Sequence, residues 1–573
     1  MRLVFVEQAI ESGASLQHLQ QCLAVIATLR EQVATLEGRN ESLENKLSML
    51  QSTLNNYVAE NDLLKRRLFG TKSERTNTSE FQLVLNGLFP EAQELQKQYE
   101  QMLCSGNDPE REGSEPKPEP EKKPRPKPKG RRDLSVLDLP RINVDIDDPE
   151  LAKQGRLIDR EQSFELLRFP GCLKVLVKHT AVYELARQGQ KTLVTASQPR
   201  RLFARSLCNE SVYAWIANEK FGLGVPLYRL EQKLELQQAS IDRGTMCRYM
   251  EELGGTLGAT VVHAMFEDAR THCHVLSTDA TGASIQPVRT ADKRRQACDK
   301  GHFFTVVADC DHVLYHYTRS HTSKAVSELF AGFSGYLQSD AASVYDILER
   351  GPPGEGEKPL QLVGCWAHCR RYFFEAAVTK HPAAVEGLRQ IRDIFAAEAK
   401  FAKLDAVARL SQRQHVIAPL FDRFFAWVEH ARQAEPGRTK LTQALGYASN
   451  QQKELRRVLL DGRLALDNNR SERALRRIVV GRKNWLFYGS DVHAEGAAAI
   501  FTVLASCRLH RIEPETYLRE VLRVLAYWPS DRYIELAPNR WQATRSRLDP
   551  AQLAAHLGEI AVPPKVELAS AAG

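Results

Sequence analysis

The sequence predicts a multidomain protein in which an N-terminal coiled coil precedes an α/β core that carries a helical insertion. Three observations indicate this fold class. An unbroken heptad pattern runs from residue 26 to residue 68, short apolar strands alternate with helices after about residue 270, and residues 370–460 are charged and helix-rich without strand signals. A chain of 573 residues is also too long for one hydrophobic core, because domains commonly contain about 100–200 residues.

Apolar residues of the N-terminal region recur with alternating spacings of three and four, which indicates a left-handed coiled coil. Asn40 and Asn61 occupy two of the seam positions. A buried asparagine there costs stability but fixes the register, usually of a parallel dimer. The alternative is one long amphipathic helix packed within the chain, but such a helix would carry a wider apolar stripe. The seam comprises Ile26, Leu29, Val33, Leu36, Asn40, Leu43, Leu47, Leu50, Leu54, Tyr57, Asn61, Leu64 and Leu68.

A stretch rich in proline and charge follows the heptads and cannot build a core. Its basic half, Lys122–Arg132, suits a phosphate backbone and equally suits a solvated spacer. Beyond it, Lys174–Val177 and Thr180–Tyr183 resemble short strands. A turn at Ser240–Thr245 between two helical segments is compatible with a helix-turn-helix, although most helical hairpins bind no DNA.

These patterns divide the chain into eight parts. They are an N-terminal coiled coil (1–75), a Pro/charge-rich linker (76–133), a small β-containing domain (134–205), a helical, helix-turn-helix-like region (206–268), the first part of an α/β core (269–369), a helical insertion (370–460), the second part of the core (461–526) and a C-terminal tail that we expect to be loosely ordered (527–573).

The order of the strands after residue 270 is that of a ribonuclease-H-like α/β fold. Two or three antiparallel strands come first, and alternating helices and strands follow. Two of the expected strands end at aspartates, because Cys273–Thr278 leads to Asp279 and Gly335–Ser339 leads to Asp340. The other expected strands are Ala283–Val288, as the hairpin partner of the first, Phe303–Ala308, Val313–Tyr317 and Leu360–Gly364.

A third acid, Glu472, completes a candidate catalytic set with Asp279 and Asp340. Phosphoryl transfer on DNA needs neutralised phosphate oxygens and an activated hydroxyl, which two divalent metals can supply. Mg²⁺, or Mn²⁺ in its place, suits carboxylate oxygens. A lone aspartate at a strand end is more often a turn or N-cap residue, but two of them in this strand order favour a metal site. Asp346 and Asp467 are the fallback ligands.

The surroundings of Glu472 favour contact with nucleic acid. With Asn469 as the N-cap, Glu472 would occupy a capping-box position, and Arg476 lies one turn further on; both are ordinary structural roles. Six cations nevertheless surround this acid, which is more than a cap requires, and they suit a phosphate backbone. Trp485 and Tyr488 could stack on an unpaired base, although core packing is the commoner role. The cations are Arg470, Arg473, Arg476, Arg477, Arg482 and Lys483.

Five stretches of the chain carry a family resemblance: Leu68–Arg75, Glu219–Arg229, Gly364–Arg371, Asp467–Arg473 and Gly481–Trp485. With them, the chain resembles the insertion-sequence-66 family of bacterial transposases from the coiled coil to about residue 525. The resemblance implies a ribonuclease-H-like catalytic core in which Asp279, Asp340 and Glu472 bind Mg²⁺. It also implies cleavage at the ends of an insertion sequence, strand transfer into target DNA, and two small accessory proteins of the same element.

The sequence departs from the family pattern at two places. Ala280 stands where the family usually has a glutamate after the first acid. Family members also often carry a small zinc-binding domain before the core, and residues 155–184 look like its strand region, but the expected cysteine pairs are absent, so we expect no zinc. His368, between Cys365 and Cys369, lacks a second half-site for a metal and is expected to pack.

Bulk properties favour a cytoplasmic protein that binds DNA, associates with itself and does not enter a membrane. The net charge of +7 is mild but clustered, and the 11 cysteines form no CxxC pair. The most apolar run, Ala497–Ala505, is too short to span a bilayer. Two alternatives to an active transposase stay open: a ribonuclease-H-like nuclease without strand transfer, and a catalytically inactive coiled-coil DNA-binding protein, which Ala280 would explain.

Overall fold

A computed structural model describes residues 24–40, 42–44, 134–137, 139–169, 171–187, 190–287, 297–309, 311–350, 360–378, 381–435 and 437–565. The chain divides into two compact units. The smaller unit comprises residues 1–114, 369–393 and 422–449, and the larger comprises residues 115–368, 394–421 and 450–573.

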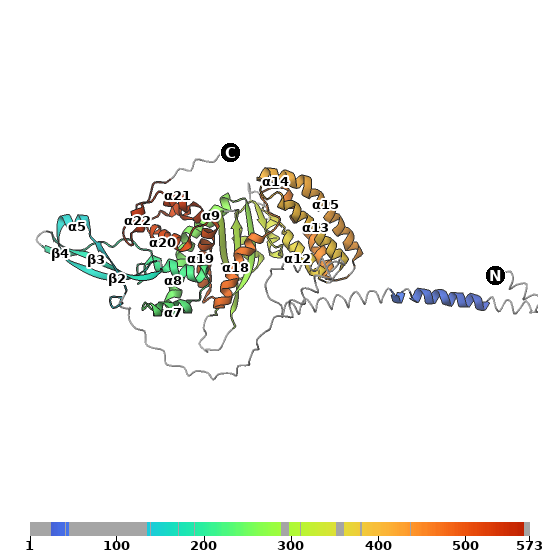
Figure 1. Ribbon diagram of the computed structural model, residues 1–573, viewed down its shortest axis with the longest axis horizontal. Helices are drawn as coiled ribbons and strands as arrows, with labels where there is room; N and C mark the ends of the chain where they lie inside the picture. The colour runs from blue at the N-terminus through green and yellow to red at the C-terminus, as the bar shows by residue number, and fades with distance from the viewer. Residues whose placement is uncertain are drawn as a thin grey trace, which may run out of the picture. The chain divides into compact units, whose positions relative to one another are not determined.

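A five-stranded mixed sheet forms the centre of the larger unit (Figure 1). Its strand order is β7-β6-β5-β8-β9. The first three strands in sequence pair antiparallel, and the last two run parallel to β5. This is the strand order predicted for a ribonuclease-H-like core. The strands are β5 (Val275–Ile285), β6 (Asp299–Ala308), β7 (His312–Thr318), β8 (Tyr336–Gln338) and β9 (Gln361–Val363).

Strand β5 is one continuous strand, and the expected hairpin between Cys273–Thr278 and Ala283–Val288 is wrong. Residues 276–285 all pair with β6. Asp279 therefore lies in the middle of β5, opposite Thr305, rather than at a strand end. The sequence misled here because Gly282 and the small polar residues around it weaken the strand pattern without breaking the strand.

Helix α19 (Asp491–Leu509) is buried on almost every side and packs against β7. The hydroxyls of Thr502 and Ser506 accept hydrogen bonds from the backbone N–H groups of Tyr315 (2.9 Å) and Val313 (3.0 Å). By length and composition α19 could cross a membrane, but 72% of its most apolar window is buried inside the structure. A helix that is apolar all round and enclosed in this way is the central helix of a core.

The remaining helices of the larger unit surround this sheet and α19 (Figure 1). The C-terminal region also packs here: Trp528, Trp541 and Leu548 are buried in the same core. The expectation of a loosely ordered tail is therefore wrong for residues 527–565. The helices are α6 (Glu210–Ala217), α7 (Leu227–Leu236), α8 (Arg243–Leu257), α9 (His263–His272), α10 (Ser323–Leu329), α11 (Ile347–Arg350), α18 (Asn469–Trp485), α20 (Pro514–Leu525), α21 (Pro538–Arg545) and α22 (Pro550–Ala554), with π-helical turns at Asn218–Gly222 and Gly258–Val262.

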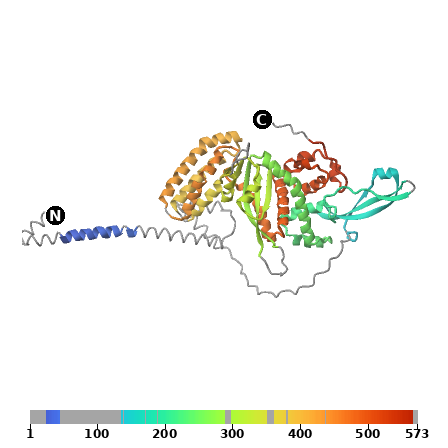
Figure 2. The same ribbon diagram turned by 180° about the vertical axis from the view of Figure 1, so that it is seen from behind.

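A second sheet forms an arm at one end of the larger unit (Figures 1 and 2). Its long hairpin contains one strand, β3, where two short runs at Lys174–Val177 and Thr180–Tyr183 were expected. At its base, buried Glu165 pairs with Arg201 (2.5 Å) and Lys178 (3.4 Å). The arm comprises β1 (Arg141–Ile146), α5 (Pro149–Gln154), β2 (Gly155–Phe169), β3 (Cys172–Arg187) and β4 (Gln190–Thr195).

The described residues between β9 and α18 form helices joined by turns and contain no strand. Within the smaller unit, Phe373 packs edge-on against Phe424 (5.8 Å) and beside Trp427 (5.9 Å). In the larger unit, the buried guanidinium of Arg413 donates to the carbonyl oxygens of Val458 and Leu464. The helices are α12 (Trp366–Ala377), α13 (Pro382–Ala399), α14 (Ala406–Gln412), α15 (Ala418–Ala434), α16 (Lys440–Asn450) and α17 (Gln452–Arg456), with a π-helical turn at Arg413–Ile417 and a 3-10 turn at Arg457–Leu459.

Residues 24–40 and 42–44 of the predicted coiled coil are helical. Their seam side chains are exposed, with Val33, Leu36 and Leu43 between 52% and 63% accessible. Asn40 lies on this helix, whereas Asn61 and residues 45–133, including the basic linker, lie outside the described residues. The helix is thus present, and its pairing stays a prediction.

The contact between α8 and α19 gives a matched pair of glycine variants. A Cβ at Gly254 would lie 2.4 Å from the backbone of Gly496, whereas a Cβ at Gly255 would meet nothing within 4 Å. We expect Gly254→Ala to destabilise the protein by about 1–3 kcal/mol, because the two helices must separate. Gly255→Ala should instead stabilise it by about 0.4–1 kcal/mol through lower entropy of the unfolded chain. Thermal and denaturant unfolding measure both, and similar effects of the two changes would contradict the close helix contact.

Candidate active site

The strand register brings Asp279 and Asp340 side by side. Strands β5 and β8 run parallel, and their last pair is Ser277 with Gln338. Asp279 lies two residues beyond that pair within β5, and Asp340 lies two residues beyond it, just after the end of β8; paired strands are about 4.8 Å apart. The two carboxylates therefore stand at the edge where β8 has ended while β5 continues.

The electrostatics of Tyr345 support this juxtaposition. Its side chain is 1% exposed, and burial raises the pKa of the hydroxyl. The negative charges of Asp340 and Asp279 raise this pKa further. Both carboxylates are therefore close enough to the Tyr345 hydroxyl to affect its pKa. A cavity of about 450 Å³ opens beside it, lined in part by Ser339, Tyr345 and the fallback ligand Asp346.

Buried Asn468 ties the start of α18 to this edge of the sheet. Its side-chain amide donates to the carbonyl oxygen of Thr278 (2.7 Å), and its backbone N–H donates to the sulfur of Cys365 (3.2 Å). The hydroxyl of Ser471 donates to the side-chain oxygen of Asn468 (2.6 Å). Asn468 is 0% exposed. Because Thr278 precedes Asp279, this residue fixes the first turn of α18 beside the first acid.

Glu472 lies in that first turn but does not act as a cap. The N-cap of α18 is Asn468 rather than Asn469, and it makes no side-chain capping bond. The alternative capping-box role is therefore wrong, because Glu472 is one residue too far along the helix to close the box. Its backbone N–H donates to the carbonyl oxygen of Asn468 (3.3 Å). The fallback residue Asp467 accepts from the backbone N–H of Asn469 (3.1 Å), as an ordinary turn aspartate does.

The carboxylate of Glu472 faces His368 on α12. The distance from Nε2 of His368 to Oε1 of Glu472 is 3.7 Å, and the two side chains are 20% and 33% exposed. Among the described residues, Glu472 pairs with His368 and not with Arg476, the partner that its position one turn earlier in α18 suggested. Nδ1 of His368 is buried without a hydrogen-bond partner in the described part of the chain. His368 was expected to pack, so its place at the acidic edge is a new finding.

The six predicted DNA-binding cations divide into two groups. Arg470, Arg473, Arg476 and Lys483 are exposed along α18, whereas Arg477 and Arg482 are partly buried. Burial lowers the pKa of Arg477. Arg482 donates to the hydroxyl of Thr281 (3.2 Å) and to the carbonyl oxygen of Gly282. Arg482 therefore holds α18 against β5, and the four exposed cations are the ones that a phosphate backbone could reach.

Carboxylates are the donor type that suits a hard divalent cation, and Asp279 on β5, Asp340 just after β8 and Glu472 in the first turn of α18 supply them. In the described residues, however, no group of three or more His, Cys, Asp or Glu side chains is close enough to hold a metal as it stands. One oxygen of Asp279 accepts from Ala280 N–H (2.8 Å) and one of Asp340 accepts from Ala342 N–H (3.1 Å).

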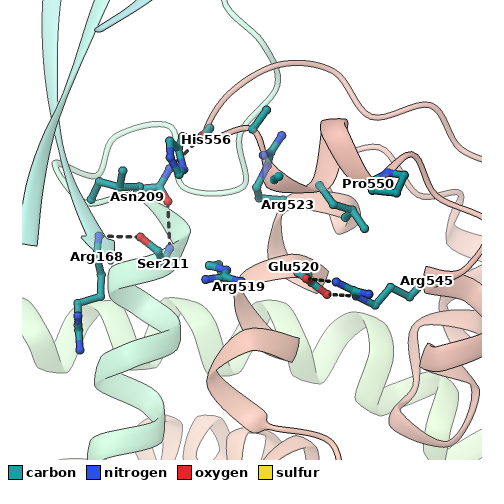
Figure 3. A pocket seen from close by; sticks show the side chains of 13 residues that line it. Arg168, Asn209, Ser211, Arg519, Glu520, Arg523, Arg545, Pro550 and His556 are labelled. Atoms are coloured by element: carbon teal, nitrogen blue, oxygen red, sulfur yellow. Dashed lines mark hydrogen bonds and ion pairs between the residues drawn. The ribbon is translucent and has the colours of Figure 1, made fainter. Parts of the chain in front are cut away.

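A different cavity, of about 340 Å³, lies between α20, the start of α6 and the residues around α22 (Figure 3). Arg519 and Arg523 line it, and Nε and Nη2 of Arg545 donate to the two carboxylate oxygens of Glu520 (2.7 and 2.9 Å). Burial, and then the charges of Arg523 and Arg519, lower the pKa of His556. Its one lining carboxylate is already neutralised, so this cavity is not a metal site.

Sequence reasoning missed three residues of the acidic edge: Tyr345, His368 and Asn468. His368 and Asn468 lie in two of the stretches that carried the family resemblance, but the prediction there was based on the acidic and basic residues. An uncharged asparagine directly before a helix start reads as a cap. Only the fold shows that its amide instead reaches the strand that carries Asp279.

Comparison with protein families gives three matches. The model described as "Transposase IS66 family" matches residues 205–496, which is just over half of the chain. The model described as "IS66 C-terminal element" matches residues 502–539. The model described as "Transposase C of IS166 homeodomain" matches residues 56–144, across the predicted end of the coiled coil and the linker.

Two similar proteins come from Sinorhizobium fredii. The chain is 27% identical to "Uncharacterized protein y4qI" over 550 residues, which cover 94% of this chain and 96% of that protein. It is 27% identical to "Uncharacterized protein y4hP" over 359 residues, which cover 59% of this chain and 63% of that protein.

The hydrogen bonds of Asn468 predict a stability difference between two neighbouring asparagines. Asn468→Ala leaves the buried carbonyl oxygen of Thr278 without its donor, which should cost about 1–3 kcal/mol. Asn469→Ala, at a partly exposed position, should change the free energy of unfolding by no more than about 0.5 kcal/mol. Denaturant unfolding of the two variants tests this, and equal losses would mean that Asn468 does not anchor α18.

Proposed function

The chain belongs to the IS66 transposase family, and from this premise we propose that it is an Asp-Asp-Glu transposase that cleaves DNA at the ends of its insertion sequence and joins them to target DNA. The observation that carries the proposal is the pairing of β5 with β8, which sets Asp279 and Asp340 side by side. The bond from Asn468 to Thr278 adds Glu472 to the same edge.

Asp279, Asp340 and Glu472 would hold Mg²⁺ or Mn²⁺. When bound, the metal supplies charge neutralisation at the phosphate and a lowered pKa for the attacking hydroxyl. The side chains around the acids would position them. Asn468 fixes the first turn of α18, which carries Glu472, and His368 pairs with the Glu472 carboxylate when no metal is bound.

The exposed cations of α18 would bind the phosphate backbone and place the scissile bond near the acids. Arg473 and Arg476 follow Glu472 on the same helix, and Lys483 lies two to three turns further on. Each is a sequence-independent contact that positions DNA without reading its bases. Recognition of the element ends would fall to other regions, among them residues 56–144, whose match is described as a homeodomain, and the helix-turn-helix-like pair α7 and α8.

The second candidate function is a catalytically inactive DNA-binding protein, which Ala280 favours because a carboxylate usual in the family is missing there. Ala280 pairs with Phe304 within the continuous strand β5, so the substitution leaves the position of Asp279 unchanged. A nuclease that only hydrolyses DNA would use the same acids and differ in lacking strand transfer. Cleavage and joining assays separate the three functions.

The acid assignment is tested by amide substitutions. Asp279→Asn, Asp340→Asn and Glu472→Gln should each reduce cleavage of a plasmid carrying the element's two ends by more than about 100-fold, because loss of even a residue that only supports a metal ligand costs 10–100-fold. Binding of the same DNA should be retained, since no cation is changed.

Asp467→Asn is the matched control, because an asparagine oxygen can still accept from the backbone N–H of Asn469. It should keep wild-type cleavage. Loss of cleavage in Asp467→Asn together with retention in Glu472→Gln would move the third ligand to Asp467. Normal DNA binding by a wild-type chain that cleaves nothing would establish the inactive alternative.

Self-association through the N-terminal helix is part of the proposal, since two DNA ends must be brought together. The double variant Leu36→Glu, Leu43→Glu places charge in the seam and should convert an assembly to a monomer of 64.7 kDa, as measured by light scattering. Thr35→Glu with Ser42→Glu adds the same charge off the seam and should leave the mass unchanged. An unchanged mass in the seam variant would show that this helix does not mediate association.

A further inference from the structure

The C-terminal end of α18 borders a cavity of about 430 Å³ that the acidic site does not use. Two of the family-like stretches, residues 219–229 and 481–485, meet there beside α7 and α8 (Figure 1). The side-chain amide of Asn484 donates to the carbonyl oxygen of Gly224 (2.7 Å) and joins the two stretches. This hydrogen bond holds together the two segments that line the cavity.

Aromatic side chains line the cavity in two layers. Inside, the ammonium of Lys220 lies 4.6 Å from the centre of the Trp485 ring, and Phe221 meets the same ring edge-on at 6.0 Å. At the rim, Tyr228 and Phe487 are each 43% exposed. The guanidinium of Arg229 lies 5.6 Å from the centre of the Tyr228 ring. Two exposed rings on the rim of one cavity, with a cation beside one of them, offer a surface on which a planar group can stack.

The chain turn that presents Phe487 is strained. Leu486 adopts φ +66° and ψ −41°, and the N–H of Phe487 donates to the carbonyl oxygen of Trp485 (2.8 Å) across it. This is a γ-turn of the rare positive-φ kind, at a leucine that is 66% exposed. The turn is pinned because Tyr488 N–H donates to the carbonyl oxygen of Ser284 (2.9 Å). Strain that the surroundings hold in place is characteristic of binding sites.

The cavity also lies along the path that DNA would take. Trp485 lies 13 positions beyond Glu472 on the same helix, a rise of about 20 Å at 1.5 Å per residue. The exposed side chains of Arg473, Arg476 and Lys483 lie between them. Lys220 contributes its side-chain nitrogen to the cavity lining, where burial lowers its pKa to about 8. A strand bound to this helix would be attracted toward the aromatic rim.

We propose that this cavity receives an unpaired base of the bound DNA, stacked on Tyr228 and Phe487, while the backbone of the same strand follows the cations of α18. The proposal rests on the proposed function, since it needs DNA at α18. Stacking on aromatic rings is tolerant of base identity, and the polar side chains of Asn484 and Gln286 at the lining offer hydrogen bonds to a base edge. A base held here would fix the strand about 20 Å from Glu472.

The test uses the full chain without metal and two duplexes of one sequence, one fully paired and one with a single bulged 2-aminopurine. Wild-type protein should bind the bulged duplex at least about tenfold more tightly and quench its fluorescence, because stacking contributes about that factor or more. The double variant Tyr228→Ala, Phe487→Ala should lose both effects and still bind the paired duplex normally. Equal wild-type affinity for the two duplexes would overturn the proposal.

Three controls complete the test. Leu223→Ala removes another side chain, 63% exposed and outside the cavity lining, and should bind like wild type; loss of the bulge preference there would overturn the assignment to this cavity. Asp279→Asn should keep the bulge preference even though cleavage is lost, so failure of the base site and failure of the catalytic proposal are distinguishable. Full competition by a free deoxynucleoside monophosphate at concentrations that leave the paired duplex bound would identify a nucleotide site instead and overturn the proposal.

Discussion

The hydrogen bond from the buried amide of Asn468 to the carbonyl oxygen of Thr278 is the contact on which the proposed chemistry depends. It joins two segments that are 190 residues apart in the chain. Thr278 directly precedes Asp279, and Asn468 directly precedes the helix that carries Glu472, so this contact holds the two segments together. Because an unpaired buried carbonyl is costly, the same bond that stabilises the fold also holds the first turn of α18 beside the sheet.

The sheet supplies the other half of the arrangement. Strand β5 pairs along its whole length with β6 but only briefly with β8, and the early end of β8 leaves Asp279 and Asp340 at an open edge. Helix α19 backs this sheet, with Thr502 and Ser506 satisfying the backbone of β7. Beyond the edge, α18 carries both the third acid and the exposed cations. The third acid of the proposed catalytic site, the cations proposed to bind the DNA backbone and part of the lining of the proposed base cavity thus all belong to α18.

The sequence predicted the strand order of the core because apolar runs and helices alternate there without ambiguity. It placed Asp279 at a strand end, which is wrong, since a small-residue strand such as the second half of β5 carries little hydrophobic signal. It favoured Glu472 as a metal ligand and left a capping box as the alternative role, which the start of α18 at Asn469 rules out, because Asn468 is the N-cap. The roles of Tyr345, His368 and Asn468 depend on residues that are distant in sequence, so no local pattern could reveal them.

The most direct test of the central claim is a crystal structure of the full chain soaked with Mn²⁺, with the anomalous signal used to place the metal. The account predicts Mn²⁺ bound by carboxylate oxygens of Asp279 and Asp340, with Glu472 turned away from His368 to complete the set. Manganese bound elsewhere, or coordination by Asp467 while Glu472 stays against His368, would contradict it.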